Sequence, residues 1–160
     1  MNDRILEKLH ALVPEHLVGS REFRGELTVT VTADVLVRVC EFLKTDPELA
    51  FDMLIDLTAV DMYRPEARFE VVYLLYSLKN TRYLRLKVTV EEERATVPTV
   101  TGVWPAANWH ERETFDMFGI RFAGHPDLRR LYMPEEFEHH PLRKDFPLMG
   151  IPDSLPLPRR

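Results

Sequence analysis

The sequence contains a single cysteine, Cys40, among 160 residues. One thiol excludes an internal disulfide, and it excludes the cysteine clusters that bind iron–sulfur centres or structural zinc ions. This chain therefore supplies no set of cysteine ligands for a redox cluster.

Long apolar runs and glycine-rich loops are also missing. No run of about 18 uncharged apolar residues occurs, and the first residues, MNDRILEKLHALV, carry charges through their apolar stripe. We therefore expect no membrane span, no secretory signal and a soluble, cytosol-facing chain. The six glycines are isolated from one another, so the sequence offers no phosphate-binding loop and no support for nucleotide binding.

A basic surplus is absent as well. The net charge is −5, and residues 125–160 contain six basic and six acidic side chains. A nucleic-acid-binding arm needs a strongly basic balance, because neutralisation of phosphates supplies most of the affinity. The neutral C-terminal region therefore excludes this interpretation of its arginine pairs.

What is present fits one globular domain, with 45% hydrophobic and 29% charged residues. Helical spacing of apolar residues predicts helices over 3–13, over 33–44 with Thr32 as N-cap, and over 105–118, ending before Gly119. Cys40 falls on the inward face of the second helix. Alternating or apolar runs predict strands over 26–32, 51–61, 68–78 and 82–90. The fold class is therefore α+β, a two-layer domain with a mostly antiparallel sheet of about four strands covered by helices.

The composition changes after Gly124. Seven of the twelve prolines lie in the last 36 residues, and proline resists regular structure. Apolar residues nevertheless recur there, so the segment needs an apolar surface from its own domain or from a partner. We predict a domain over 1–124 and an extended, proline-rich, partner-binding tail over 125–160.

The segment WHERETFD, 109–116, concentrates charged side chains on the third helix. His110 and Glu111 begin a zinc-protease pattern, but Thr114 stands where the second histidine should be, so we reject a hydrolase site. Glu111 falls on the apolar face. We favour a buried ion pair with Arg129 or Arg143 over an acid with a perturbed pKa.

Histidines and arginines punctuate the tail, at His125, His139 and His140 among others. His-Pro pairs are typical of turns, and no carboxylate or cysteine is spaced to complete a metal site, so we expect no metal. The arginines gain value only when they are desolvated against carboxylates.

Residues 108–148, NWHERETFDMFGIRFAGHPDLRRLYMPEEFEHHPLRKDFPL, closely resemble the signature of the C-type subunit, the 30 kDa subunit, of the proton-pumping NADH:quinone oxidoreductase, complex I. FDMLIDLTAVD, RFEVVYLLYSL and VPTVTGVWPAANW extend the resemblance upstream. It implies a non-catalytic structural subunit of the hydrophilic arm, peripheral on the cytoplasmic side of the cell membrane. It also implies a tail that lies against the quinone-module (D-type) subunit, while other subunits bind FMN, iron–sulfur clusters and quinone.

The resemblance places the family motif on residues of 111–147, and we expect sixteen of them to be partner-binding or structural. No catalytic, cofactor-binding or metal-binding residue is expected. The sixteen are Glu111, Arg112, Glu113 and Asp116 on the helix, His125, Pro126, Asp127, Leu128, Arg129 and Arg130, and then His140, Pro141, Leu142, Arg143, Lys144 and Asp145. His139 stands where the family usually has glycine.

Two alternatives remain open at this point. Similar subunits occur in membrane-bound hydrogenases and in other quinone-linked dehydrogenases. A less favoured alternative is a stand-alone enzyme that uses His110 and Glu111.

Overall fold

The computed structural model describes residues 1–64 and 66–151. The helices are α1 (Asn2–Leu12), α2 (Leu36–Thr45), which follows a single 3-10 turn η1 (Ala33–Val35), and α3 (Ala107–Phe118). The strands are β1 (Leu17–Phe23), β2 (Glu26–Val31), β3 (Met53–Asp61), β4 (Phe69–Ser77), β5 (Arg82–Val90), β6 (Thr96–Pro98) and β7 (Arg121–Ala123). The predicted elements are all present, with shifted ends.

The main sheet has five strands in the order β1-β2-β5-β4-β3. Within this sheet only β2 and β5 pair in parallel, so the prediction of a mostly antiparallel sheet is confirmed; β6 and β7 form a separate parallel pair. The prediction of about four strands missed β1. This edge strand is exposed along nearly its whole length, so it lacks the alternation of buried and exposed residues by which the other strands were found.

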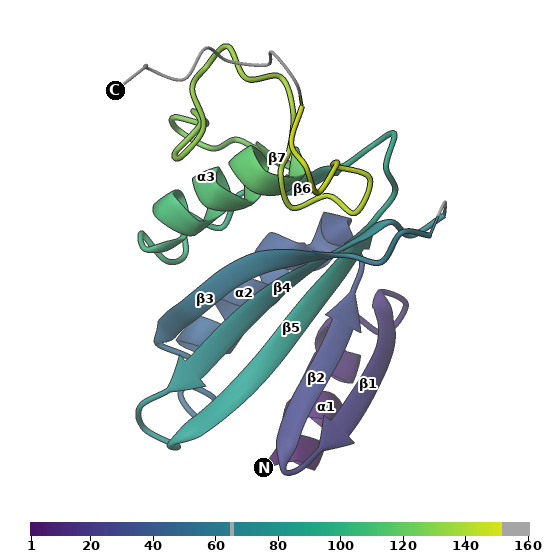
Figure 1. The fold of residues 1–160 in the computed structure, drawn as a ribbon. Coiled ribbons are helices and arrows are strands. Elements are labelled where there is room, and N and C mark those ends of the chain that lie inside the picture. The colour runs from purple at the N-terminus through teal and green to yellow at the C-terminus, as the bar shows by residue number, and fades with distance from the viewer. Residues whose placement is uncertain (65, 152–160) are drawn as a thin grey trace.

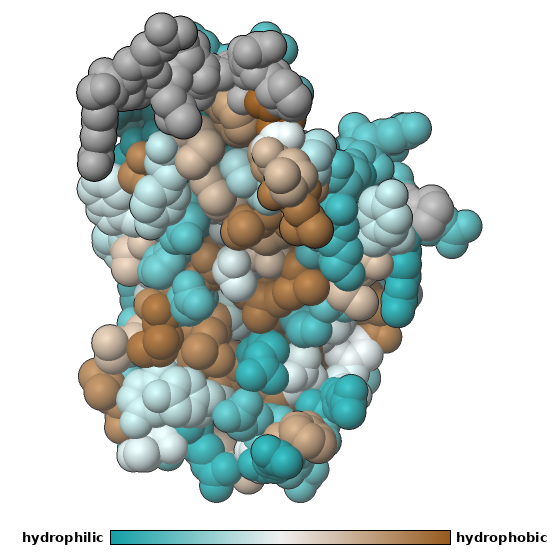
Figure 2. Space-filling view, viewed as in Figure 1, coloured by the Kyte–Doolittle hydropathy of each residue, from teal (hydrophilic) through white to brown (hydrophobic). Residues whose placement is uncertain are grey.

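Helices α1 and α2 cover one face of this sheet, behind it in Figure 1. The alternate side chains of β2, β4 and β5 that face these helices are buried, and Cys40 on α2 lies among them, as predicted. The opposite face mixes hydrophilic and hydrophobic side chains (Figure 2). A sheet with one face on the core and one face toward water is the usual antiparallel arrangement.

Helix α3 lies beyond the edge strand β3 and ends at Gly119, whose φ of 75° places it in the left-handed region. The predicted glycine stop is therefore confirmed. Thr32 is the N-cap residue of η1, as predicted, but its hydroxyl lies 3.0 Å from His16 Nδ1 and makes no cap hydrogen bond.

The tail, residues 125–160, is described as far as residue 151, and the predicted remainder, 152–160, lies outside the described residues. Over 125–151 it consists of turns without helix or strand. It lies across α3 at the end of the molecule away from the N-terminus (Figure 1). No helix in the described part of the chain is long and apolar enough to cross a bilayer.

Candidate functional site

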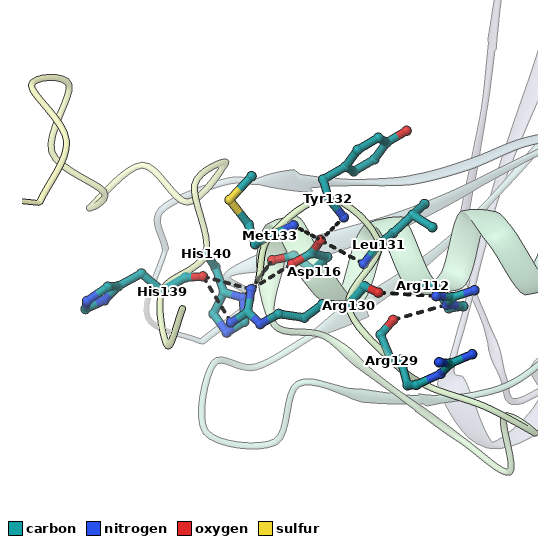
Figure 3. Close-up of polar contacts among 9 residues, drawn as sticks. All are labelled: Arg112, Asp116, Arg129, Arg130, Leu131, Tyr132, Met133, His139 and His140. Atoms are coloured by element: carbon teal, nitrogen blue, oxygen red, sulfur yellow. Dashed lines mark hydrogen bonds and ion pairs between the residues drawn. The ribbon is translucent and has the colours of Figure 1, made fainter. Parts of the chain in front are cut away.

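One carboxylate, that of Asp116 on α3, organises the first half of the tail (Figure 3). Its Oδ2 accepts hydrogen bonds from three successive backbone N–H groups, those of Leu131 at 3.0 Å, Tyr132 at 2.6 Å and Met133 at 2.9 Å. Its Oδ1 accepts from Arg130 Nη1 at 2.7 Å. Backbone N–H groups that converge in this way form an anion-binding concavity, here filled by the protein's own carboxylate.

Asp116 is fully buried because the tail covers the side of α3 from which it projects. Burial alone would raise the pKa of Asp116. The hydrogen bonds from Met133, Tyr132, Arg130 and Leu131 outweigh burial and hold this pKa below its usual value. The carboxylate therefore stays ionised at neutral pH and keeps the tail docked.

The His-Pro-Leu-Arg motif of the tail completes the C-terminal end of α3. His140 Nδ1 donates to the carbonyl of Asp116 at 2.9 Å, Leu142 N to that of Met117 at 3.1 Å and Arg143 Nε to that of Phe118 at 2.6 Å. The last carbonyl groups of a helix have no partner within the helix. The motif is therefore a helix cap supplied by residues that follow more than twenty positions later.

Gly119 makes this cap possible in two ways. Its left-handed backbone ends α3. A Cβ at this position would also lie only 2.5 Å from His140 Nε2 and 2.6 Å from Arg143 Nη2. The tail thus packs against the α3 end at a distance that only glycine allows.

A second anchor joins the tail to the start of β4 and the end of β3. Asp61 Oδ2 accepts from Lys144 N at 2.8 Å, and Arg68 pairs with both Asp61, at 3.1 Å, and Asp145, at 2.8 Å. Arg68 also pairs with Glu92. Its side chain is 5% exposed, so one buried guanidinium connects three carboxylates from three segments.

Sequence reasoning missed Asp61, Arg68 and Glu92. A signal existed for the first two: Asp61 occupies an inward-facing position at the end of an apolar strand, and Arg68 directly precedes the next strand. A carboxylate and a guanidinium at facing ends of a hairpin indicate a buried ion pair. No local pattern links either of them to Lys144 or Asp145.

The predicted partners of Glu111 are wrong. Glu111 is buried as expected, but its Oε1 accepts from Val100 N at 2.7 Å and its Oε2 from the Thr99 hydroxyl at 2.5 Å. Arg143 instead caps α3, and Arg129 pairs with Asp127. Without a cation, burial raises the pKa of Glu111 to about 7, so the alternative of a perturbed acid applies.

His125, the first residue of the tail, lies next to the carboxylate of Glu111. Its Nδ1 accepts from Asp127 N at 3.0 Å, and its Nε2 lies 3.2 Å from the carbonyl of Asn108 and 3.9 Å from Glu111 Oε2. Because Nδ1 accepts, Nε2 carries the proton that is donated to Asn108. Both ring nitrogens therefore make hydrogen bonds that fix the first turn of the tail.

Arg112 supports the same turn from the outside of α3. Its guanidinium donates to the carbonyls of Arg129 at 3.1 Å and Arg130 at 3.2 Å, and it lies 4.9 Å from the Trp109 ring centroid. Leu128 packs partly buried against the core.

The remaining predicted site residues, Glu113, Pro126 and Pro141, make no side-chain hydrogen bond or ion pair with the described residues. Among residues 1–64 and 66–151, no three histidine, cysteine or acidic side chains gather as metal ligands would. Most of the predicted motif residues therefore belong either to the tail or to the surface of α3 on which the tail docks.

Comparison with known proteins identifies the family of this chain. Residues 29–152 match the family described as "Respiratory-chain NADH dehydrogenase, 30 Kd subunit". The chain belongs to this family. The resemblance drawn from residues 108–148 is thereby confirmed.

Relatives of the family cover most of the chain. The C-type subunit of NADH-quinone oxidoreductase from Roseiflexus sp. (strain RS-1) is 54% identical over 92% of this chain and 84% of its own length. The corresponding subunit of Geotalea uraniireducens is 47% identical over 97% of this chain and 93% of its own length.

Two solved structures share the fold. A trypsin-resistant fragment of Nqo5 is 35% identical, has a TM-score of 0.68 and covers 80% of this chain and all of the fragment. A chain of the membrane-bound sulfane sulfur reductase, an archaeal respiratory membrane complex, is 27% identical, has a TM-score of 0.75, and covers 92% of this chain and 86% of its own.

Proposed function

We propose that this chain is a non-catalytic structural subunit of an NADH:quinone oxidoreductase and that its tail, 125–160, joins it to the neighbouring quinone-module subunit. The observation that carries this proposal is that the charged residues of the motif make contacts between the tail and its own domain. Asp116, His140 and Arg143 bind the tail to its own domain, so these charged residues of the motif are used to build a shaped surface.

The two residues of the alternative, stand-alone enzyme lie in different surroundings. His110 Nδ1 lies 3.3 Å from Asp56 on β3, whereas Glu111 is buried against Thr99 and Val100. A general acid and base must both reach one substrate. These positions favour a structural role for each residue.

In the assembled enzyme, we propose that FMN, iron–sulfur clusters and quinone are held by other subunits and that this chain is peripheral, on the cytoplasmic side of the membrane. The single cysteine, itself buried on α2, agrees with this assignment. All sixteen motif residues then serve either the docked tail or the contact with the partner.

A second candidate is the equivalent subunit of a sister complex. The similarity to a chain of the membrane-bound sulfane sulfur reductase, at a TM-score of 0.75, supports this second candidate. Complexes of this class differ in the electron donor, so the co-purifying subunits distinguish the candidates.

The test is to tag this chain in its native host, to solubilise the membranes mildly, and to identify the co-purifying subunits by mass spectrometry with and without residues 125–160. We expect NADH-oxidising and quinone-module subunits with the full chain and their loss on truncation, while the truncated domain stays folded by circular dichroism. Assembly of the truncated chain at the wild-type level would contradict the role of the tail. Subunits of a different electron-input module would favour the sister complex.

A further inference from the structure

The docked tail has an inner side and an outer side of different character. On the inner side, Arg130, His140 and Arg143 are bound to α3, and Phe137 is 7% exposed. The Phe137 ring lies 6.0 Å from Arg130 and 6.3 Å from Phe146. The contacts of this side bind the tail to its own domain.

The outer side carries large apolar side chains that the domain does not cover. Leu148 is 104% exposed, Met149 98% and Leu142 54%. A hollow of about 220 Å³ next to these residues is lined by both polar and apolar side chains, among them Glu138, His140, Arg143 and Pro147. Apolar side chains held at the surface in this way mark a contact region.

Acidic side chains accompany this apolar surface. Burial of Phe137 fixes the turn that contains it, and Glu135, Glu136 and Glu138 on either side are exposed. Among the described residues, none of these three glutamates forms an ion pair, whereas Asp116 on α3 and Asp145 in the tail both do. These glutamates therefore present negative charge that no cation of residues 1–64 and 66–151 pairs with.

We propose, on the basis of the function proposed above, that the partner subunit binds this outer side through an apolar pocket for Leu148 and Met149 with a lysine- or arginine-bearing rim for Glu135, Glu136 and Glu138. Two observations favour this occupant: burial of the exposed apolar side chains against a partner is favourable, and cationic side chains of a partner would complement the three exposed carboxylates. An anionic membrane surface is a poorer fit, because it would repel the same carboxylates. The tail meets its partner as a surface already shaped by Asp116 and Asp61.

The experiment compares two double or triple variants with matched controls in the tagged chain in its native host. The apolar variant is Leu148→Ser with Met149→Ser, and its control is Leu78→Ser at the exposed β4–β5 turn. The charge variant is Glu135→Gln, Glu136→Gln and Glu138→Gln, and its control is Glu91→Gln with Glu93→Gln, two exposed carboxylates outside the tail. Co-purifying subunits are quantified at several salt concentrations.

We expect the apolar variant to lower recovery of the quinone-module subunit by about tenfold or more. The charge variant should lower recovery at low salt and weaken its dependence on salt, because ionic contacts are screened. Both controls should behave as wild type. Hydrogen exchange of the amides of Leu131, Tyr132 and Met133 shows whether the tail stays docked. If these amides show that the tail of the apolar variant is undocked, a lower recovery with that variant no longer tests the partner contact, and the recovery of the charge variant then tests the inference.

Wild-type recovery with both tail variants would overturn the inference while leaving the proposed function in place. If the wild-type chain recovers no other subunit, the proposed function fails, and this inference fails with it. Binding of the purified chain to vesicles containing phosphatidylglycerol, abolished in the apolar variant, would replace the protein partner by a lipid surface.

Discussion

The carboxylate of Asp61 accepts a hydrogen bond from the backbone N–H of Lys144 at 2.8 Å, across 83 positions of sequence. Asp61 closes a strand of the central sheet, and Lys144 belongs to a proline-rich segment without helix or strand. This contact and those of Asp116 fix the tail at two points. The tail is therefore part of the folded domain as well as a candidate contact for other chains.

Replacing Asp116 by Asn should release the first half of the tail. The N–H groups of Leu131, Tyr132 and Met133 all donate to Oδ2, so an Asn carbonyl would be left with them as a weaker, uncharged acceptor, while its NH2 group would face Arg130, which loses both its acceptor and its counter-charge. We expect the free energy of unfolding to fall by about 3 kcal/mol. Urea denaturation and faster hydrogen exchange at those three amides would measure this. Glu113→Gln, on the same helix, is the control, and an equal effect of both changes would refute the assignment.

The same carboxylate predicts an acid limit for tail docking. The pKa of Asp116 is lower in the folded chain than the usual value of about 3.9 for an unfolded one. Its contribution is therefore complete above about pH 4 and is lost as the pH falls through the folded pKa. Hydrogen exchange at Leu131 to Met133 should accelerate there relative to a β5 amide. Uniform acceleration at all amides would indicate global acid unfolding instead.

Replacing Gly119 by Ala should disturb the cap of α3. The φ of 75° costs a non-glycine residue about 1–2 kcal/mol, and the new Cβ would also displace His140 and Arg143. We expect a total loss of about 2 kcal/mol or more in thermal or urea unfolding. Gly102→Ala is the matched control, because a Cβ there meets no atom within 4 Å. Indifference at Gly119 would show that the tail does not rest on it.

Glu111 should make stability depend on pH near neutrality. Burial raises the pKa of Glu111 to about 7, above the unfolded value, so folding favours the protonated form. Its contribution to stability falls as the pH rises from about 4.5 to about 7 and is level beyond that. Glu111→Gln should therefore gain up to about 3 kcal/mol relative to wild type between pH 5 and pH 8. A pH-independent difference between the two proteins in urea unfolding would rule out the raised pKa.

Removal of Arg68 should cost far more than removal of one of its surface partners. Arg68→Met leaves Asp61 buried without its cation, which costs about 3–5 kcal/mol. Asp145 is 45% exposed, so Asp145→Asn should cost about 1 kcal/mol or less. Comparable losses in urea unfolding would mean that Arg68 does not bury the charge of Asp61.

The sequence was most informative where structure is local. Periodicity located the helices and the inward-facing strands, and Gly119 marked the end of α3, because spacing and backbone freedom are written into neighbouring residues. β1 was missed because its exposed residues have no reason to alternate. The family motif identified the residues of the site through resemblance, and most of them do lie together.

Their partners could not be predicted. Glu111 was assigned an arginine because burial of a carboxylate usually requires one, yet Thr99 and the backbone of Val100 serve instead. Asp116 has the polar neighbours of a solvent-facing residue, and only the path of the tail buries it. Such pairings depend on chain geometry over long separations, for which side-chain spacing carries no signal.

The parallel pairing of β2 with β5 also affects how the chain is made. Val31 ends β2 and Arg82 begins β5, so ribosomal synthesis of the intervening segment takes about 3–10 s at roughly 5–20 residues per second. During that interval β5, the strand that pairs with Leu27, Val29 and Val31, has not yet been made. The middle of the sheet therefore closes only after β5 has emerged, and until then β2 exposes an edge that other nascent chains could pair with.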